Sequence, residues 1–335
     1  MRLSAFTVVD AYPEDPGAAD RLLDVVALAR SAEAAGLSTL WVAEHHFQTG
    51  GVCPAPPVLL AACGAATRRI RLGALVSVLP FHSPVEVAEQ YAMLDRLTGG
   101  RLNLGVGSGY IPLELEGFGV DPATKRERFD RALATVLAGL EGREIVGDSA
   151  GARPVRLNVR PVQDPHPPIW VAVQRPEAVA PVARRGFSIA LIPYATVPNV
   201  PALAEQIGVY RANRPAGGRG EVAIGLHVYA GDRVADARKA FRRYLESRLQ
   251  TQSTFYQRKA AADPASATPE GIERSGFAVF GPAADVARRL RDLARVGVDE
   301  ILGIFDFGGL PRSEVERSVA ALGAAWADAS VRDGP

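Results

Sequence analysis

A carboxylate and two imidazoles follow one another at Glu44-His45-His46, and two of the five histidines of the chain lie there. This stretch is the densest group of side chains that titrate near neutral pH. The residues before it, Ser38–Ala43, are mostly apolar and predict a buried strand. Because parallel α/β proteins carry their sites at the C-terminal ends of strands, we expect this strand to deliver polar groups to such a site.

The spacing of these residues argues against a metal site. Chelation usually takes histidines two apart on a strand or four apart on a helix, and the chain has neither His-x-His nor HExxH. Adjacent residues on a strand point to opposite faces, so only one of His45 and His46 can line a cavity unless the strand has ended. We therefore expect no metal, one histidine that donates or accepts a proton, and one that packs; the spacing does not choose between them.

Two further stretches combine a strand end with residues suited to a ligand. Gly105–Tyr110 is close to a dinucleotide fingerprint but has tyrosine where the pattern requires glycine. It predicts a glycine-lined strand end that a flat ligand approaches, or alternatively a tight turn. Gln174-Arg175-Pro176 opens a helix, where free backbone N–H groups and a cation suit a phosphate; an ordinary surface arginine is the alternative.

Other histidines and charged residues have simpler interpretations. His82 precedes a helix and is interpreted as a capping or surface residue. Lys125–Arg128 predicts a solvated helix face and not a nucleic-acid patch. His227 lies within an apolar strand and is interpreted as a satisfied interior residue, with a role in the barrel as the alternative.

Apolar runs and helical patterns alternate along the chain. Eight strands are predicted, at 3–9, 38–43, 70–78, 102–106, 169–173, 187–192, 222–229 and 300–305. Eight helices are predicted, at 20–35, 56–66, 84–97, 125–140, 177–185, 201–210, 234–249 and 283–296. This order predicts an α/β fold, a single-domain (β/α)8 TIM barrel over residues 1–335, with a doubly wound sheet as the alternative.

Two segments fit neither kind of element and are predicted to be insertions, at about 142–168 and 250–280. The polar part of the second, Gln250–Gly276, predicts either a mobile lid or a surface insertion.

Composition favours a cytoplasmic enzyme that acts on a small molecule. The 38 Lys and Arg residues against 37 Asp and Glu residues give a net charge of +1, so neither nucleic acid nor an anionic membrane is an expected partner. We find no signal peptide and no run of about 18 apolar residues. The two cysteines, Cys53 and Cys63, are expected to be reduced thiols.

Several motifs together resemble the luciferase-like flavin monooxygenase family, which includes bacterial luciferase. They are Trp41–Phe47, Leu72–Pro80, Gly99–Gly107, Phe118-Gly119 and Arg128-Phe129. The resemblance is strongest over residues 1–140 and covers nearly the whole chain. It implies a (β/α)8 barrel with reduced FMN at the C-terminal ends of the strands.

The resemblance also implies roles for individual residues. The family's catalytic histidine falls on His45, and a non-prolyl cis peptide beneath the flavin falls on Leu75-Val76. Glu44 is expected either to orient a neighbouring group in the catalytic site or to pack behind it. The remaining implied cofactor-binding residues are Ser77, Gly107, Ser108, Tyr110, Gln174, Arg175 and Ala178. Phe47 and Tyr110 are expected to shape the substrate pocket. Ser108 and Gly107 stand where luciferase has an arginine and a reactive cysteine, so light emission is not implied.

The function that the resemblance implies is a two-component monooxygenase. Reduced FMN from a separate reductase would react with O2 through a C4a-peroxyflavin, and His45 would act as general acid/base on a small organic substrate. A deazaflavin-dependent oxidoreductase that transfers hydride is the alternative, and a non-catalytic flavin-binding paralogue is a third. The resemblance further implies a homodimer, formed through the Ala-rich helix near 56–67 and its neighbour.

Overall fold

Eight parallel strands close into a barrel in the computed structural model, which describes residues 1–12, 14, 20–146, 153–218, 220–250 and 254–332. The barrel strands are β1 (Arg2–Thr7), β2 (Thr39–Val42), β3 (Arg71–Val78), β4 (Leu102–Gly107), β5 (Ile169–Ala172), β6 (Ser188–Leu191), β7 (Val222–Ala230) and β9 (Glu300–Ile304). Closure is direct: β1 pairs with β2 on one side and with β9 on the other. The predicted (β/α)8 barrel is therefore confirmed, and the open doubly wound sheet is wrong.

A ninth strand, β8 (Ala278–Gly281), was not predicted. It pairs in parallel with the second half of β7, where His227 lies opposite Ala278, while β6 pairs with the first half. The nine residues of β7 are all buried, so its second half requires a partner for its backbone groups, and β8 supplies one.

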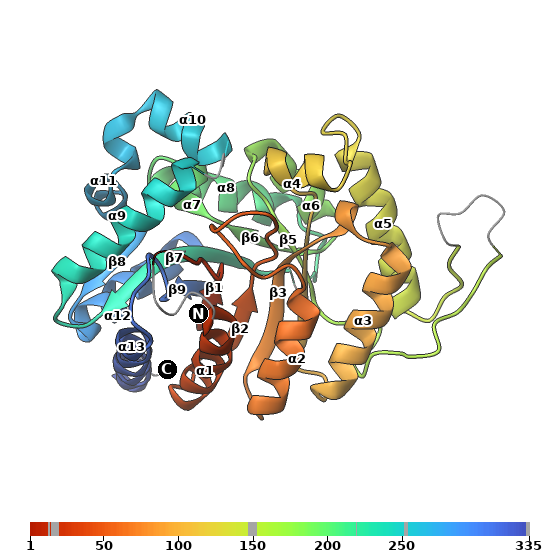
Figure 1. The fold of residues 1–335 in the computed structure, drawn as a ribbon, viewed down its shortest axis with the longest axis horizontal. Helices are drawn as coiled ribbons and strands as arrows, with labels where there is room; N and C mark the ends of the chain where they lie inside the picture. The colour runs from red at the N-terminus through yellow and green to blue at the C-terminus, as the bar shows by residue number, and fades with distance from the viewer. Residues whose placement is uncertain (13, 15–19, 147–152, 219, 251–253, 333–335) are drawn as a thin grey trace.

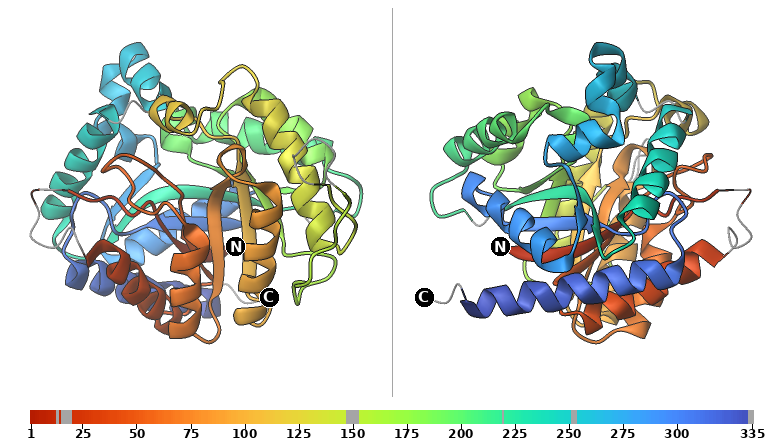
Figure 2. Two further views of the ribbon diagram at one scale, coloured as in Figure 1. Left: turned by 45° about the vertical axis from the view of Figure 1, so that its right-hand side comes forward. Right: turned by 90° about the vertical axis from the view of Figure 1, so that its left-hand side faces the viewer.

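Helices surround the barrel (Figure 1). The predicted helices appear as α1 (Arg21–Ala34), α2 (Pro56–Ala66), α3 (Pro84–Leu97), α5 (Lys125–Leu140), α6 (Val179–Arg184), α8 (Val200–Asn213), α9 (Val234–Gln250) and α12 (Ala283–Asp292). Short helices α4 (Pro112–Gly117) and α7 (Pro193–Thr196) follow β4 and β6. An unpredicted final helix, α13 (Arg312–Arg332), packs beside α1 and α12 (Figure 2). None of the helices within the described ranges is both long and apolar enough to cross a membrane.

The polar segment after α9 is mostly helical, which the sequence did not predict, and its role as a mobile lid or a surface insertion stays a prediction. It contains α10 (Thr254–Ala262), a short 3₁₀ helix at Pro264–Ala267 and α11 (Pro269–Arg274), while residues 251–253 lie outside the described ranges. The side chain of Asp263 accepts from Ser266 N and that of Thr268 from Gly271 N, so capping groups begin the two later turns. The other predicted insertion contains one isolated bridge, Ile145 to Val155, within its described part.

Charged side chains close the N-terminal end of the barrel. Glu300 accepts hydrogen bonds from Ser4, from the Trp41 indole at 3.0 Å and from Arg2 at 2.6 Å. The Trp41 ring packs edge-on against Trp170 with centroids 5.4 Å apart. Because this end is filled, a ligand site must lie at the opposite end, where the strands finish.

Beside the ends of β1 and β9, Asp306 is buried in a small polar network. Its Oδ2 accepts from Thr7 Oγ1 at 2.6 Å and lies 3.8 Å from the Arg21 guanidinium, which also approaches Asp10. Its Oδ1 has no hydrogen-bond partner among the described residues. Burial, opposed by the charge of Arg21 and aided by that of Asp10, raises the pKa of Asp306 to about 7.

We expect Asp306→Asn to flatten the pH dependence of stability. A carboxyl group whose pKa is higher in the folded state keeps its proton while the unfolded chain loses it, so stability falls as pH rises from about 4 to about 7. The loss is on the order of a few kcal/mol at 1.4 kcal/mol per pKa unit. Urea unfolding at several pH values measures it. The exposed Asp232→Asn variant should keep the wild-type slope, and the same slope in Asp306→Asn would contradict the prediction.

Candidate active site

A cavity of about 670 Å³ opens at the C-terminal ends of the barrel strands. Ten of the predicted site residues line it: Glu44, His45, Leu75, Val76, Gly107, Ser108, Tyr110, Gln174, Arg175 and Ala178. The peptide between Leu75 and Val76 is cis, as expected. The cavity thus brings together side chains that follow β2, β3, β4 and β5.

Two predicted residues lie elsewhere. Phe47 is 60% exposed, has a positive φ of 60° and is absent from the cavity wall. Ser77 is buried next to the cis peptide and does not reach the wall. Neither residue lines the cavity, and the roles expected of them, Phe47 in the substrate pocket and Ser77 in cofactor binding, stay predictions.

His45 is fixed by a carboxylate that the sequence analysis missed. Strand β2 ends at Val42, so alternation no longer applies and His45 is free to turn toward the cavity. Its Nδ1 lies 3.0 Å from Glu114 Oε1, which also accepts from the backbone N–H of His46 at 3.0 Å and from Gln48 at 2.9 Å. Gly51 packs against the imidazole, because a Cβ there would come within 2.6 Å of the ring.

The bonds at Glu114 decide the tautomer of His45. Burial alone would raise the pKa of Glu114, but the hydrogen bonds from His45, His46 and Gln48 lower it below its ordinary value. An ionised carboxylate only accepts, so Nδ1 of His45 carries a hydrogen and donates it. Nε2 has no protein partner among the described residues and is available for a proton at the cavity wall.

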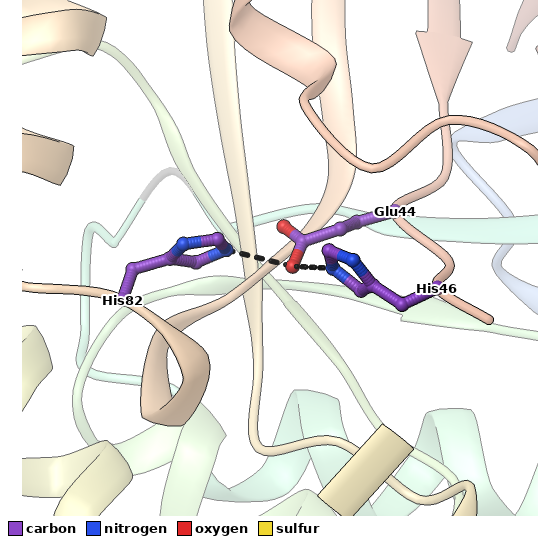
Figure 3. Close-up of side chains that lie close together, drawn as sticks. All are labelled: Glu44, His46 and His82. Carbon is purple, nitrogen blue, oxygen red and sulfur yellow. Dashed lines mark hydrogen bonds and ion pairs between the residues drawn. The ribbon is translucent and has the colours of Figure 1, made fainter. Parts of the chain in front are cut away.

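Glu44, His46 and the partly buried His82 form a second cluster, which reaches the cavity wall at Glu44 (Figure 3). Glu44 Oε1 lies 3.0 Å from His46 Nε2 and 2.8 Å from His82 Nε2, and its Oε2 accepts from Val78 N at 3.0 Å. Burial would raise the pKa of Glu44, but these bonds lower it, so both imidazoles donate to an ionised carboxylate. His82 is therefore neither a cap nor a plain surface residue: it joins the loop after β3 to the loop after β2.

This cluster also has the donor types of a transition-metal site. The three ligand atoms lie within 4.8 Å of one another, a closeness that the sequence could not reveal because His82 is 36 positions beyond His46. The ring of His46 packs against Phe118 with centroids 4.6 Å apart, which agrees with its expected packing role. The prediction that the protein uses no metal at its active site stays a prediction.

One end of the cavity is cationic. Lys125 and Arg126 line it together with Arg175, and Lys125 Nζ donates to the carbonyl of Gly109 at 2.6 Å. Burial and then the charge of Arg175 lower the pKa of Lys125. The interpretation of Lys125–Arg128 as a solvated face was thus wrong for Lys125, which is half-buried, whereas Arg126 is exposed and pairs with Asp130.

Arg248, Tyr194 and Tyr244 also line the cavity and were missed. Arg248 is 3% exposed and belongs to α9, where it continues the buried stripe of Ala237, Phe241 and Tyr244. An arginine at the next position of a buried helical stripe is the signal that could have revealed it.

His227 on β7 differs from its interpretation as a satisfied residue. It is fully buried among Tyr194, Phe241 and Tyr244, and neither ring nitrogen has a hydrogen-bond partner within the described ranges. Burial, with the charge of Arg248, lowers its pKa well below the ordinary value, so it is neutral at physiological pH.

Comparison with known proteins finds relatives that match most of this chain. The family described as luciferase-like monooxygenase matches residues 1–300. Protein y4wF of Sinorhizobium fredii, itself uncharacterized, is 32% identical over 92% of each chain. The oxygenase component of the flavin-dependent trigonelline monooxygenase of Acinetobacter baylyi is 25% identical over 96% of this chain and 92% of its own. Monooxygenase RslO1 from Streptomyces bottropensis superposes with a TM-score of 0.81 at 25% identity, covering 98% of this chain and 99% of its own.

More distant solved structures share the fold alone. They include the oxygenating constituent of 3,6-diketocamphane monooxygenase of Pseudomonas putida in complex with FMN, at 18% identity and a TM-score of 0.79. They also include an F420-dependent secondary alcohol dehydrogenase, at 14% identity and a TM-score of 0.72. The match over residues 1–300, on a closed parallel barrel with its cavity at the strand ends, shows that this chain belongs to the luciferase-like family of flavin-dependent monooxygenases.

Proposed function

We propose that this chain is the oxygenase component of a two-component monooxygenase. It would take reduced FMN from a separate reductase, use O2, and oxygenate a small organic substrate, with His45 as general acid/base. The observation that carries the proposal is the His45 imidazole at the cavity wall, held at Nδ1 by Glu114 and with no partner at Nε2 in the part of the chain that the structure describes. The relation to the trigonelline enzyme, named as an oxygenase component, supports the partnership with a reductase.

The cavity suits FMN in shape and in charge. Gly107 leaves room for the Val76 side chain at the wall, since a Cβ at position 107 would come within 2.7 Å of a Val76 methyl carbon. Arg175 and Lys125 would hold the phosphate, with Gln174 and Ala178 beside them. Leu75, Val76, Ser108 and Tyr110 would enclose the ring system. When bound, reduced FMN would supply the electrons that activate O2.

The protein groups orient the reaction and move its proton. Glu114 keeps a hydrogen on Nδ1 of His45, so that Nε2 can accept a proton from the cavity or, once protonated, return it. Glu44 would act as a positioning residue, because its bonds to His46 and His82 hold the loop that carries His45. The apolar wall formed by Phe6, Ile192 and Ile304 would limit access of water.

The second candidate is a deazaflavin-dependent oxidoreductase, favoured by the F420-dependent enzymes that share the fold. The protein is mixed anaerobically with chemically reduced FMN or reduced F420 and candidate substrates, and labelled O2 is then admitted. We expect tight binding of reduced FMN, no turnover before O2, and label in the product afterwards. Turnover with reduced F420 without O2 would overturn the proposal. Failure to turn over with either, with FMN bound, would point to a non-catalytic paralogue.

We expect Arg175→Met to weaken the binding of FMN roughly tenfold or more, because a charge-assisted hydrogen bond to phosphate contributes about 1.5–3 kcal/mol. Riboflavin, which lacks the phosphate, should bind the variant and the wild type alike. Fluorescence titration measures both affinities, and Arg184→Met on the exposed side of α6 is the matched control. An equal loss for FMN and riboflavin would remove Arg175 from the phosphate site.

We further propose a homodimer formed through α2 and α3. These neighbouring helices expose the large apolar side chains of Val58 (72%), Met93 (53%) and Leu97 (67%). Light scattering should give twice the chain mass for the wild type. Leu97→Glu, which places a charge in the interface, should shift the species toward the monomer. A monomeric wild type would contradict this proposal and leave the catalytic one intact.

A further inference from the structure

Arg248 brings a buried positive charge to the same region of the cavity as His45. Its Nη2 donates to the carbonyl of Gly50, and the next residue, Gly51, packs on the His45 ring. The guanidinium also lies over the Tyr244 ring, 4.8 Å from its centroid. Since Arg248 is 3% exposed and lines the cavity, its charge faces an enclosed space in which electrostatic interactions are strong.

Three phenols accompany this charge. Tyr194 and Tyr244 line the cavity with their hydroxyl oxygens 3.2 Å apart, and the Tyr110 ring lies edge-on to His45 at 6.3 Å. Burial raises the pKa of Tyr110 to about 12 and that of Tyr194 well above the ordinary value. Both phenols therefore keep their hydrogens at neutral pH and can donate to an acceptor. We call Arg248 with these three tyrosines the arginine–tyrosine wall.

The arginine–tyrosine wall is separate from the cationic end that suits the FMN phosphate. Its arginine comes from α9, whereas Lys125 begins α5, and the two helices lie on opposite sides of the barrel (Figures 1 and 2). Tyr110, which would also border the flavin ring, lies between the two regions, since Lys125 bonds the carbonyl of the preceding Gly109. A ligand that occupies the cationic end therefore leaves Arg248, Tyr194 and Tyr244 to a second molecule.

We propose that the arginine–tyrosine wall binds a carboxylate, or a similarly acidic oxygen, on the substrate and presents the rest of the molecule to His45. The presentation of the substrate to His45 rests on the proposed function, whereas the binding of the carboxylate to Arg248 does not. The substrate class is a small molecule with one anionic oxygen group and an apolar body, because Phe6, Ile192 and Ile304 line the remaining cavity. The guanidinium fork matches a carboxylate in geometry and charge.

The test uses benzoate and benzamide, which have nearly the same shape but differ in charge. Binding of each to the protein, with and without FMN, is measured by calorimetry at neutral pH. We expect wild type to prefer benzoate by roughly tenfold or more, which corresponds to a hydrogen bond with a charged group. Arg248→Met should abolish the preference, and Arg248→Lys should keep part of it. Arg242→Met, on the same helix but exposed and paired with Glu270, should leave it unchanged.

Each outcome bears on the inference. No preference in the wild type, or a full preference in Arg248→Met, would overturn it. An FMN affinity within about twofold of that of the wild type shows that Arg248→Met is folded. If Arg248→Met does not fold, the inference is decided by the benzoate preference of the wild type compared with that of Arg248→Lys. A preference for benzoate in a protein that does not bind FMN would sustain the inference and reject the proposed function, so the two failures are distinguishable.

Discussion

Replacing His45 by glutamine is expected to lower turnover by about 10²–10⁴-fold while FMN affinity stays within a few-fold of wild type. The His45 imidazole packs on Gly51, keeps a hydrogen on Nδ1 through Glu114, and leaves Nε2 at the cavity wall to accept or return a proton. Glutamine fills similar space and still reaches Glu114, but it offers no group that exchanges a proton near neutral pH. The loss should therefore appear in kcat and not in the binding of the cofactor.

The measurement is steady-state oxygenation with reduced FMN supplied by a reductase, beside a fluorescence titration of FMN. His166→Gln, which changes a histidine in the segment before β5 and outside the cavity wall, is the matched control and should keep wild-type turnover. Full turnover by His45→Gln would remove His45 from the reaction. His46 would then become the histidine to test.

Glu114→Gln should have the second largest effect, a fall in turnover of at least about tenfold. The amide can present an N–H to Nδ1, which favours the tautomer with its hydrogen on Nε2 and removes the acceptor from the cavity. If the amide oxygen instead takes the place of Oε1, which accepts all three hydrogen bonds, it accepts more weakly than a carboxylate and holds the Nδ1 hydrogen less firmly. FMN binding should be unchanged, because Glu114 belongs to α4 and not to the cationic end.

A double-mutant cycle separates this positioning role from a merely structural one. If Glu114 acts through His45, the Glu114→Gln substitution should cost little further turnover once His45 is glutamine. Independent effects that multiply would contradict the positioning role. Chemical denaturation of all four proteins serves as the control, since a loss of stability would be shared by both backgrounds.

The barrel and the positions of its strand ends were predictable from the sequence. Apolar runs that end in polar or glycine residues define β2, β3, β4 and β5, and the side chains immediately after them, among them His45 and Arg175, line the cavity as expected. This part succeeds because parallel strands in a barrel finish at one rim, so local order along the chain becomes proximity in space.

The partners of those side chains were not predictable. Glu114 meets His45 across 69 positions, and Arg248 meets Gly50 across 198. Such pairs depend on how α4 and α9 settle on the barrel rim, and no local pattern encodes that. Phe47 lies outside the cavity wall and has a left-handed backbone conformation, which the sequence pattern does not show, although His45 of the same motif lines the wall.

The origin of Arg248 on α9 has a consequence for how this enzyme can change. The proton-handling pair comes from the β2 and β4 sides of the rim, whereas the charge proposed to select the substrate comes from α9, which lies with α10 and α11 on another side of the barrel (Figure 1). This proposed selecting charge, in the helical block α9–α11, and the acid–base pair are thus encoded by different stretches of sequence. A chimera that exchanges this block with that of a relative should inherit the relative's choice of substrate and retain its own His45 and Glu114.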